Sequence, residues 1–164
     1  MDWHNVDKEF DKYAEDQLKE TDIMVFGRVT YDLMVSYWPT ETAMKADPVI
    51  ADFMNKTPKI VFSRTMDKAD WNNTTLIKDN AVEEIKKLKQ QPGKRMIIMG
   101  SADLSTTFIK NDLIDEYHIL LNPVVLGNGH PLFKNVVEKF KLQLISSRAF
   151  KNGNVLLQYQ TIKE

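Results

Sequence analysis

The alternation of short apolar runs with amphipathic stretches is the feature of this sequence that most limits its fold. Apolar runs at 22–26, 59–63, 74–78 and 95–99 have the length and composition of buried strands, and helical patterns lie between them. Strands that alternate with helices form βαβ units, in which neighbouring strands run parallel. The sequence therefore predicts an α/β fold built on a largely parallel sheet.

Helices are expected where apolar residues recur with a period near 3.6. The stretches that meet this condition are 5–20, 28–37, 42–56 with an interruption at Pro48, 81–90 and 101–110.

The last third of the chain has a different pattern. A longer strand is expected at 115–126, and two more at 140–150 and 155–162 flank the turn at 151–154, which contains an Asn-Gly pair. Asn-Gly between two strands is typical of a hairpin, whose strands must pair antiparallel. We therefore expect a mixed sheet whose antiparallel part lies at the C-terminal end.

Composition narrows the functional classes. The 164 residues are 43% hydrophobic and 27% charged, which favours one globular domain spanning 1–164. A net charge of -1 argues against nucleic acid as a partner, since phosphate binding of that kind usually requires a basic excess. The chain has no cysteine, no signal-peptide core at its start and no apolar run long enough to cross a membrane, so a cytoplasmic protein is expected.

A metal site is not expected, because His4, His118 and His130 show no ligand spacing.

Two glycines occupy equivalent places in the pattern. Gly27 and Gly100 each follow a short apolar strand and precede a helix, so two helix N-termini should meet at one edge of the parallel sheet. The free N–H groups and the helix dipole both attract an anion there. Such a junction alone is more often a simple chain turn, so the prediction depends on what surrounds it.

A third strand end adds groups that bind phosphate. Ser63, Arg64 and Thr65 supply two hydroxyls and a guanidinium, and Arg28 and Thr30 stand beside Gly27. Taken singly, Arg64 reads as a solvated surface charge and the hydroxyls as turn residues. Together these groups match a pyrophosphate and one further phosphate. NADPH carries that further phosphate and NADH does not.

Several segments resemble the dihydrofolate reductase superfamily, in the branch that contains the reductase domain of the bifunctional riboflavin-biosynthesis protein and small stand-alone relatives. They are GRVTYDLM, VFSRT, IIMGSADLSTTFI, DLIDEYHILLNPVVLGNGHPLF and the closing hairpin, in that order. The resemblance covers nearly the whole chain. It implies a three-layer fold with a mixed, mostly parallel sheet, a C-terminal antiparallel hairpin, helices on both faces, NADPH as cofactor and a homodimer.

The resemblance also implies roles for individual residues. Gly27, Arg28 and Thr30 match the family's first phosphate loop, with the arginine near the adenosine phosphate and the threonine at the pyrophosphate. Residues 63–65 match the loop around the adenosine 2′-phosphate. The turn under the pyrophosphate and nicotinamide corresponds to Gly100, Ser101, Ala102, Asp103 and Leu104. The family usually has two adjacent glycines in this turn, and Ser101 stands in place of the second.

The substrate side is less complete. The family's first strand lies in the middle of its sheet and precedes the position of Met1, so it is expected to have been cut from this sequence, to be unobserved, or to come from a partner. The residues that match the family's Asp-Trp pair or that we expect to form a wall against a flat ring are Asp2, Trp3, Tyr31, Met34, Tyr37 and Trp38. Most aromatic residues of a small domain are core packing, which is the alternative for the aromatic members, and Asp2 is also explained as a helix N-cap or a solvated charge. No catalytic residue is assigned.

Two functions therefore remain at this stage. The first is an NADPH-dependent reductase of a small planar heterocycle, pteridine-like or ribosylaminopyrimidine-like, acting on CH–NH or C=N groups. Reduction of 5-amino-6-(5-phosphoribosylamino)uracil in riboflavin biosynthesis is the activity that the resemblance implies most directly. The second is a non-catalytic homodimeric domain that retains the fold while its cofactor turn has changed.

Overall fold

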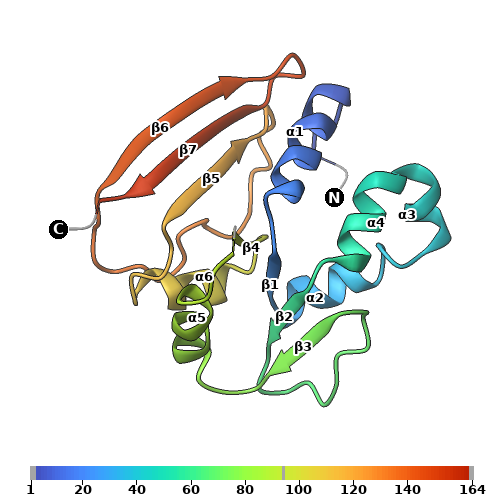
Figure 1. The fold of residues 1–164 in the computed structure, drawn as a ribbon. Helices are drawn as coiled ribbons and strands as arrows, with labels where there is room; N and C mark the ends of the chain where they lie inside the picture. Colours follow the sequence, from blue (N-terminus) through green and yellow to red (C-terminus); the bar gives the residue numbers. More distant parts are fainter. Residues whose placement is uncertain (1–2, 94, 163–164) are drawn as a thin grey trace.

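Four short parallel strands form the first sheet of the computed structural model, which describes residues 3–93 and 95–162 (Figure 1). The strands are β1 (Ile23–Gly27), β2 (Lys59–Phe62), β3 (Thr74–Ile77) and β4 (Met96–Ile98), in the order β3-β2-β1-β4. Gly27 pairs with Phe62, and Val25 pairs with Ile98. The carboxyl ends of β1, β2 and β4 therefore share one edge.

In the described residues, six helices connect and cover these strands. They are α1 (Lys8–Lys19), α2 (Arg28–Val35), α3 (Glu41–Ala46), α4 (Pro48–Lys56), α5 (Ala81–Lys89) and α6 (Ala102–Ile109). The interruption expected at Pro48 is confirmed, because Pro48 begins α4 and the Asp47 carboxylate accepts a hydrogen bond from the Ile50 N–H. Proline is favoured at this first helical position, since its missing N–H would have no partner there.

Alternation along the parallel strands gives the sheet two apolar faces. One core cluster holds Leu18, Met24, Phe26, Tyr31, Met54, Val61 and Trp71, and the other holds Val25, Ile60, Phe62, Ile85 and Phe108. Successive residues of a strand point to opposite faces, so β1 and β2 contribute to both clusters. Helices α1, α2 and α4 supply the first cluster, α5 and α6 the second, and the α/β three-layer arrangement is confirmed.

A second sheet of three antiparallel strands contains β5 (Glu116–Leu121), β6 (Leu142–Ala149) and β7 (Val155–Thr161), in the order β5-β7-β6. The predicted C-terminal hairpin is confirmed as β6 and β7. The prediction of a strand as far as residue 126 is wrong, because β5 ends at Leu121. Pro123 has no N–H for a ladder, and the Asn122 side chain accepts a hydrogen bond from the Asn5 N–H instead.

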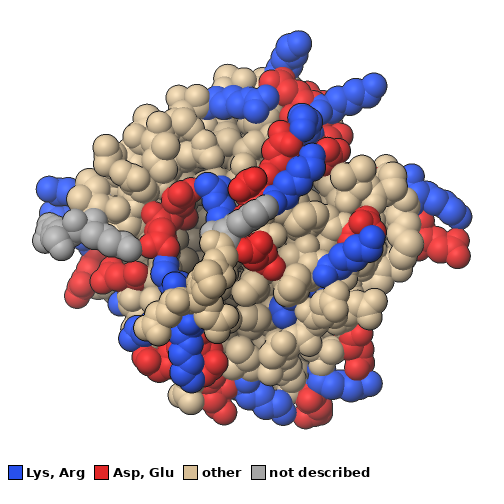
Figure 2. Space-filling view, in the orientation of Figure 1, with Lys and Arg blue, Asp and Glu red and all other residues tan. Residues whose placement is uncertain are grey.

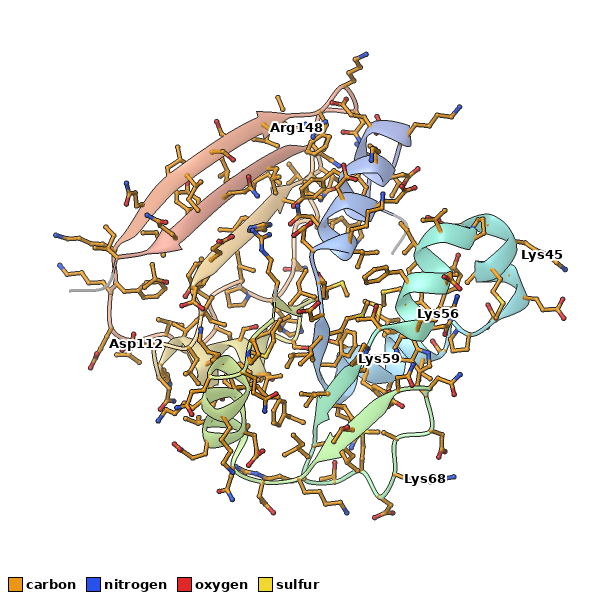
Figure 3. All side chains as sticks on the ribbon, in the orientation of Figure 1. Lys45, Lys56, Lys59, Lys68, Asp112 and Arg148 are labelled. Carbon is orange, nitrogen blue, oxygen red and sulfur yellow. The ribbon has the colours of Figure 1, made fainter. Side chains whose placement is uncertain are left out.

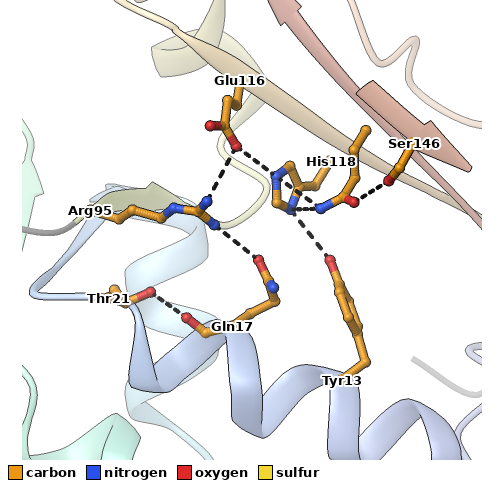
Figure 4. Close-up of polar contacts among 8 residues, drawn as sticks. Tyr13, Gln17, Thr21, Arg95, Glu116, His118 and Ser146 are labelled. Carbon is orange, nitrogen blue, oxygen red and sulfur yellow. Dashed lines mark hydrogen bonds and ion pairs between the residues drawn. The ribbon is translucent and has the colours of Figure 1, made fainter. Parts of the chain in front are cut away.

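In the described part of the chain, no strand of the first sheet pairs with a strand of the second. The expected mixed sheet is therefore two sheets, of which the first ends at β4 and the second begins at β5. The central first strand that the resemblance implies is not among the seven described strands. Polar contacts connect the two parts instead (Figure 4). Arg95, just before β4, lies 3.6 Å from the Glu116 carboxylate, and the Tyr13 hydroxyl of α1 lies 3.3 Å from His118 Nδ1 of β5.

The surface carries interspersed charges of both signs on the face drawn in Figure 2, and a largely uncharged area lies over β6 and β7. Among the described residues, no helix combines the length and the apolar character that a membrane span requires.

Candidate functional site

Three turns meet at the carboxyl edge of the parallel sheet, and they are the turns that the sequence analysis singled out. Residues 27–30 begin at the last residue of β1, residues 63–65 follow β2 and residues 100–104 follow β4. Because β2 and β4 pair with opposite sides of β1, the turn after β1 lies between the other two. The edge of an open α/β sheet at which strands end is the usual place for a ligand.

The turn after β1 opens α2 without a side-chain cap. Gly27 is the N-cap residue and offers no side chain, so the first N–H groups of α2 lack the partner that a serine or aspartate would give. Arg28 donates from Nη1 to Thr65 Oγ1 over 2.9 Å, and its Nε lies 3.5 Å from the Asp32 carboxylate. Arg28 thus ties this turn to the one after β2.

The turn after β4 is tied to α2 by a serine hydroxyl. The Gly27 N–H donates to Ser101 Oγ over 2.9 Å, and Ser101 Oγ donates to Thr30 Oγ1 over 2.9 Å. Gly100 and Ser101 have φ values of 66° and 55°, both in the left-handed region. Ser101 is the N-cap residue of α6 but makes no side-chain bond to that helix.

The turn after β2 leaves one cation free. Ser63 Oγ is buried and accepts hydrogen bonds from the N–H groups of Thr65 and Met66, at 3.3 and 3.1 Å, so its oxygen shapes the turn. Arg64 is exposed and has no hydrogen bond or ion pair to any residue that the structure describes. Its guanidinium is therefore available to a ligand, whereas that of Arg28 is already engaged.

The start of α6 brings in a residue that the sequence analysis missed. Lys134 Nζ lies 2.9 Å from the Asp103 carboxylate, and the Lys134 carbonyl accepts a hydrogen bond from Thr106 Oγ1. No local pattern could have revealed this contact, because the segment carrying Lys134 crosses over α6 from a distant part of the chain. Ala102 begins α6, and Leu104 packs against the second core cluster.

The residues proposed for a substrate wall are divided between the core and the surface. Tyr31 is only 3% exposed, and its hydroxyl accepts a hydrogen bond from the Trp71 N–H, so this residue packs in the core, which is the alternative that the sequence left open for the aromatic side chains. Met34 and Trp38 pack against the same cluster. Trp3 and Tyr37 are exposed. Asp2 lies outside the described residues.

The chemical capacity of this edge follows from these groups. Two helices begin side by side with N–H groups that no N-cap side chain satisfies, and helix dipoles make such positions attractive to anions. A free guanidinium stands at the end of the neighbouring strand. The arrangement suits a ligand with a diphosphate and a separate phosphate group.

Comparisons with known sequences agree with one another. The model of the RibD C-terminal domain family matches residues 2–156. The uncharacterized protein YyaP of Bacillus subtilis (strain 168) is 36% identical over 159 residues, which cover 97% of this chain and 83% of that protein. The uncharacterized protein YwjB of the same strain is 31% identical over 151 residues, covering 92% of this chain and 80% of that protein.

Solved structures share the fold. A candidate riboflavin biosynthesis protein from Shewanella sp. PV-4 is 26% identical with a TM-score of 0.74, covering 99% of this chain and 88% of its own. The diaminohydroxyphosphoribosylaminopyrimidine deaminase/5-amino-6-(5-phosphoribosylamino)uracil reductase of Thermotoga maritima is 14% identical with a TM-score of 0.63. That match covers 96% of this chain and 50% of the Thermotoga chain.

Proposed function

Because the chain belongs to the RibD C-terminal domain family, a family of reductases, we propose that it is an NADPH-dependent reductase of a small planar nitrogen heterocycle. The substrate class is proposed from the likeness in fold to the Thermotoga maritima protein, whose name includes reduction of a ribosylaminouracil. The reaction proposed is reduction at a CH–NH or C=N group.

One observation carries the cofactor proposal. The N-termini of α2 and α6 lie next to each other, joined through Ser101, and neither receives a hydrogen bond from its N-cap side chain. An isolated helix start is common, but two linked starts on one edge offer donors to both halves of a pyrophosphate.

The choice of NADPH over NADH depends on the turn after β2. Arg64 would bind the adenosine 2′-phosphate through charge-assisted hydrogen bonds, and the Ser63 hydroxyl proton would add a donor beside it. Arg28 would hold the neighbouring turn through Thr65. Lys134 offsets the negative charge of Asp103 next to the pyrophosphate position, which keeps the start of α6 receptive to an anion.

Hydride for the reduction would come from the bound nicotinamide, which carries the difficult chemistry. The work of this chain is to orient the dinucleotide by its phosphates and to exclude water from the ring.

Titration with NADPH and NADH, followed by nicotinamide fluorescence, tests the proposal. We expect NADPH to bind more tightly than NADH. Arg64→Ala should weaken NADPH about tenfold or more, because a hydrogen bond to a charged group contributes about 1.5–3 kcal/mol, and should leave NADH nearly unchanged. Lys68→Ala, an exposed cation paired with Asp70 outside the three turns, is the control and should have no effect.

Two results would contradict the proposal. Equal losses of NADPH and NADH in Arg64→Ala would remove the role of that guanidinium. If the wild-type protein binds neither dinucleotide, the alternative of a non-catalytic domain with a changed cofactor turn is favoured.

A further inference from the structure

A directed chain of hydrogen bonds connects the two helix starts of the proposed cofactor site. It runs from the Gly27 N–H to Ser101 Oγ and from Ser101 Oγ to Thr30 Oγ1, with 2.9 Å at each step. An N–H group can only donate, so Ser101 must accept from Gly27. Its single proton is then given to Thr30.

The direction of this chain determines what Thr30 can do. Since Thr30 Oγ1 accepts from Ser101, its own proton must go to another acceptor, and no described residue supplies one. Thr30 lies in the first turn of α2, half-buried beside the helix N-terminus. Its hydroxyl is therefore a donor held at the position where an anion is favoured. A donor that is itself accepting a hydrogen bond is polarised and donates more strongly.

Ser101 combines a backbone conformation that is unusual for serine with a side chain that bonds outside its own helix. Ser101 has φ 55° and ψ 51°, a left-handed conformation that glycine adopts more easily. A serine at an N-cap normally accepts a hydrogen bond from its own helix, but this one faces α2 instead. The strained conformation thus leaves the start of α6 uncapped and gives its hydroxyl to the neighbouring helix.

We propose that Ser101 is a positioning residue for the pyrophosphate of the dinucleotide: it fixes the start of α6 against the start of α2 and commits the Thr30 hydroxyl to donation. The inference rests on the proposed function, because it names how that same site is organised. Ser101 acts through Thr30 and Gly27. Compared with a second glycine in this turn, it has less backbone freedom but supplies a hydroxyl for these hydrogen bonds.

Two pairs of variants test the chain of contacts. Ser101→Ala and Ser101→Gly both remove the hydroxyl, while the glycine also relieves the backbone. Thr30→Val removes the hydroxyl at nearly constant shape, and Thr30→Ser retains it. We expect Ser101→Ala, Ser101→Gly and Thr30→Val each to weaken NADPH binding about tenfold, and Thr30→Ser to bind like the wild type. The double variant Ser101→Ala/Thr30→Val should lose no more than either single variant, because both break one chain.

Adenosine 2′-monophosphate separates positioning from general damage, since it carries the 2′-phosphate and no pyrophosphate. We expect its affinity to be unchanged in the Ser101 and Thr30 variants and reduced in Arg64→Ala. Equal losses of both ligands would show a merely structural role. Tighter NADPH binding by Ser101→Gly would show that the side chain crowds the cofactor. Either result overturns this inference while the wild-type protein still binds NADPH, whereas a wild type that binds no dinucleotide overturns the proposed function itself.

Discussion

Lys59 is a lysine buried in the core of the protein. It is 1% exposed, and its Nζ donates to the carbonyls of Met54, Asn55 and Thr57 at the end of α4, at 2.8, 3.3 and 2.6 Å. The ammonium also lies 4.6 Å from the centre of the Trp71 ring. Figure 3 shows Lys59 among the packed elements, while Lys45 and Lys68 extend outward. The last carbonyls of a helix carry partial negative charge, which explains why a cation is tolerated there.

The buried ammonium predicts a pH-dependent stability. Burial lowers the pKa of Lys59 from 10.5 to about 8. Between these values the unfolded chain binds the proton more tightly than the folded protein, so the free energy of unfolding should rise as pH increases from about 8 to 10.5. The expected gain is at most about 3 kcal/mol. Urea unfolding measured at several pH values checks it, with Lys59→Met as the variant that cannot titrate. Parallel curves for the two proteins would contradict the prediction.

Local signals predicted the separate elements well. The strands and helices up to residue 110 follow from short apolar runs, the Asp47-Pro48 break and glycines after strands, because each depends on residues close in sequence. Lys59 shows the limit: it opens an apolar run, and nothing nearby indicates that α4 would receive its ammonium. The same holds for the site. Gly27 and Gly100 marked the turns, but the bond between Ser101 and Thr30 depends on the pairing of β1 with β4.

The turn between β6 and β7 contains a glycine in the left-handed region. The Gly153 N–H donates to the Phe150 carbonyl and the Phe150 N–H to the Asn154 carbonyl, which closes a three-residue loop. Gly153 has φ 89°, and a Cβ there would lie 3.1 Å from Pro123 Cγ. The left-handed conformation and the contact both disfavour a side chain.

Gly153→Ala should therefore lower the free energy of unfolding by about 1–2 kcal/mol. The matched control is Gly129→Ala, where a Cβ would meet no atom within 4 Å, and its effect should stay within about 0.5 kcal/mol. Urea unfolding of the three proteins at one pH measures the difference. A Gly153→Ala variant as stable as the control would show that the hairpin tolerates another turn.

At the scale of the whole molecule, several large apolar side chains are exposed on the surface near β6. Phe133, Val137 and Phe140 line an open hollow of about 330 Å³ next to the start of β6, and Val137 is 87% exposed. Ile145 of β6 is also exposed, and β6 is an edge strand of its sheet as described. Apolar patches beside an unpaired strand edge favour association, and two copies of one edge strand are self-complementary when antiparallel.

We therefore predict that two copies of this chain associate through the surface around β6. Sedimentation equilibrium should give twice the chain mass of 19.0 kDa. The double variant Val137→Asp/Ile145→Asp should sediment as a monomer, because charges at an apolar contact would be desolvated without a partner. Val29→Asp, at an 81% exposed position on α2, is the control and should remain dimeric. A monomeric wild type would exclude the dimer. A control that dissociates as readily as the double variant would place the contact elsewhere, because only a dimer held by the β6 surface responds to these substitutions selectively.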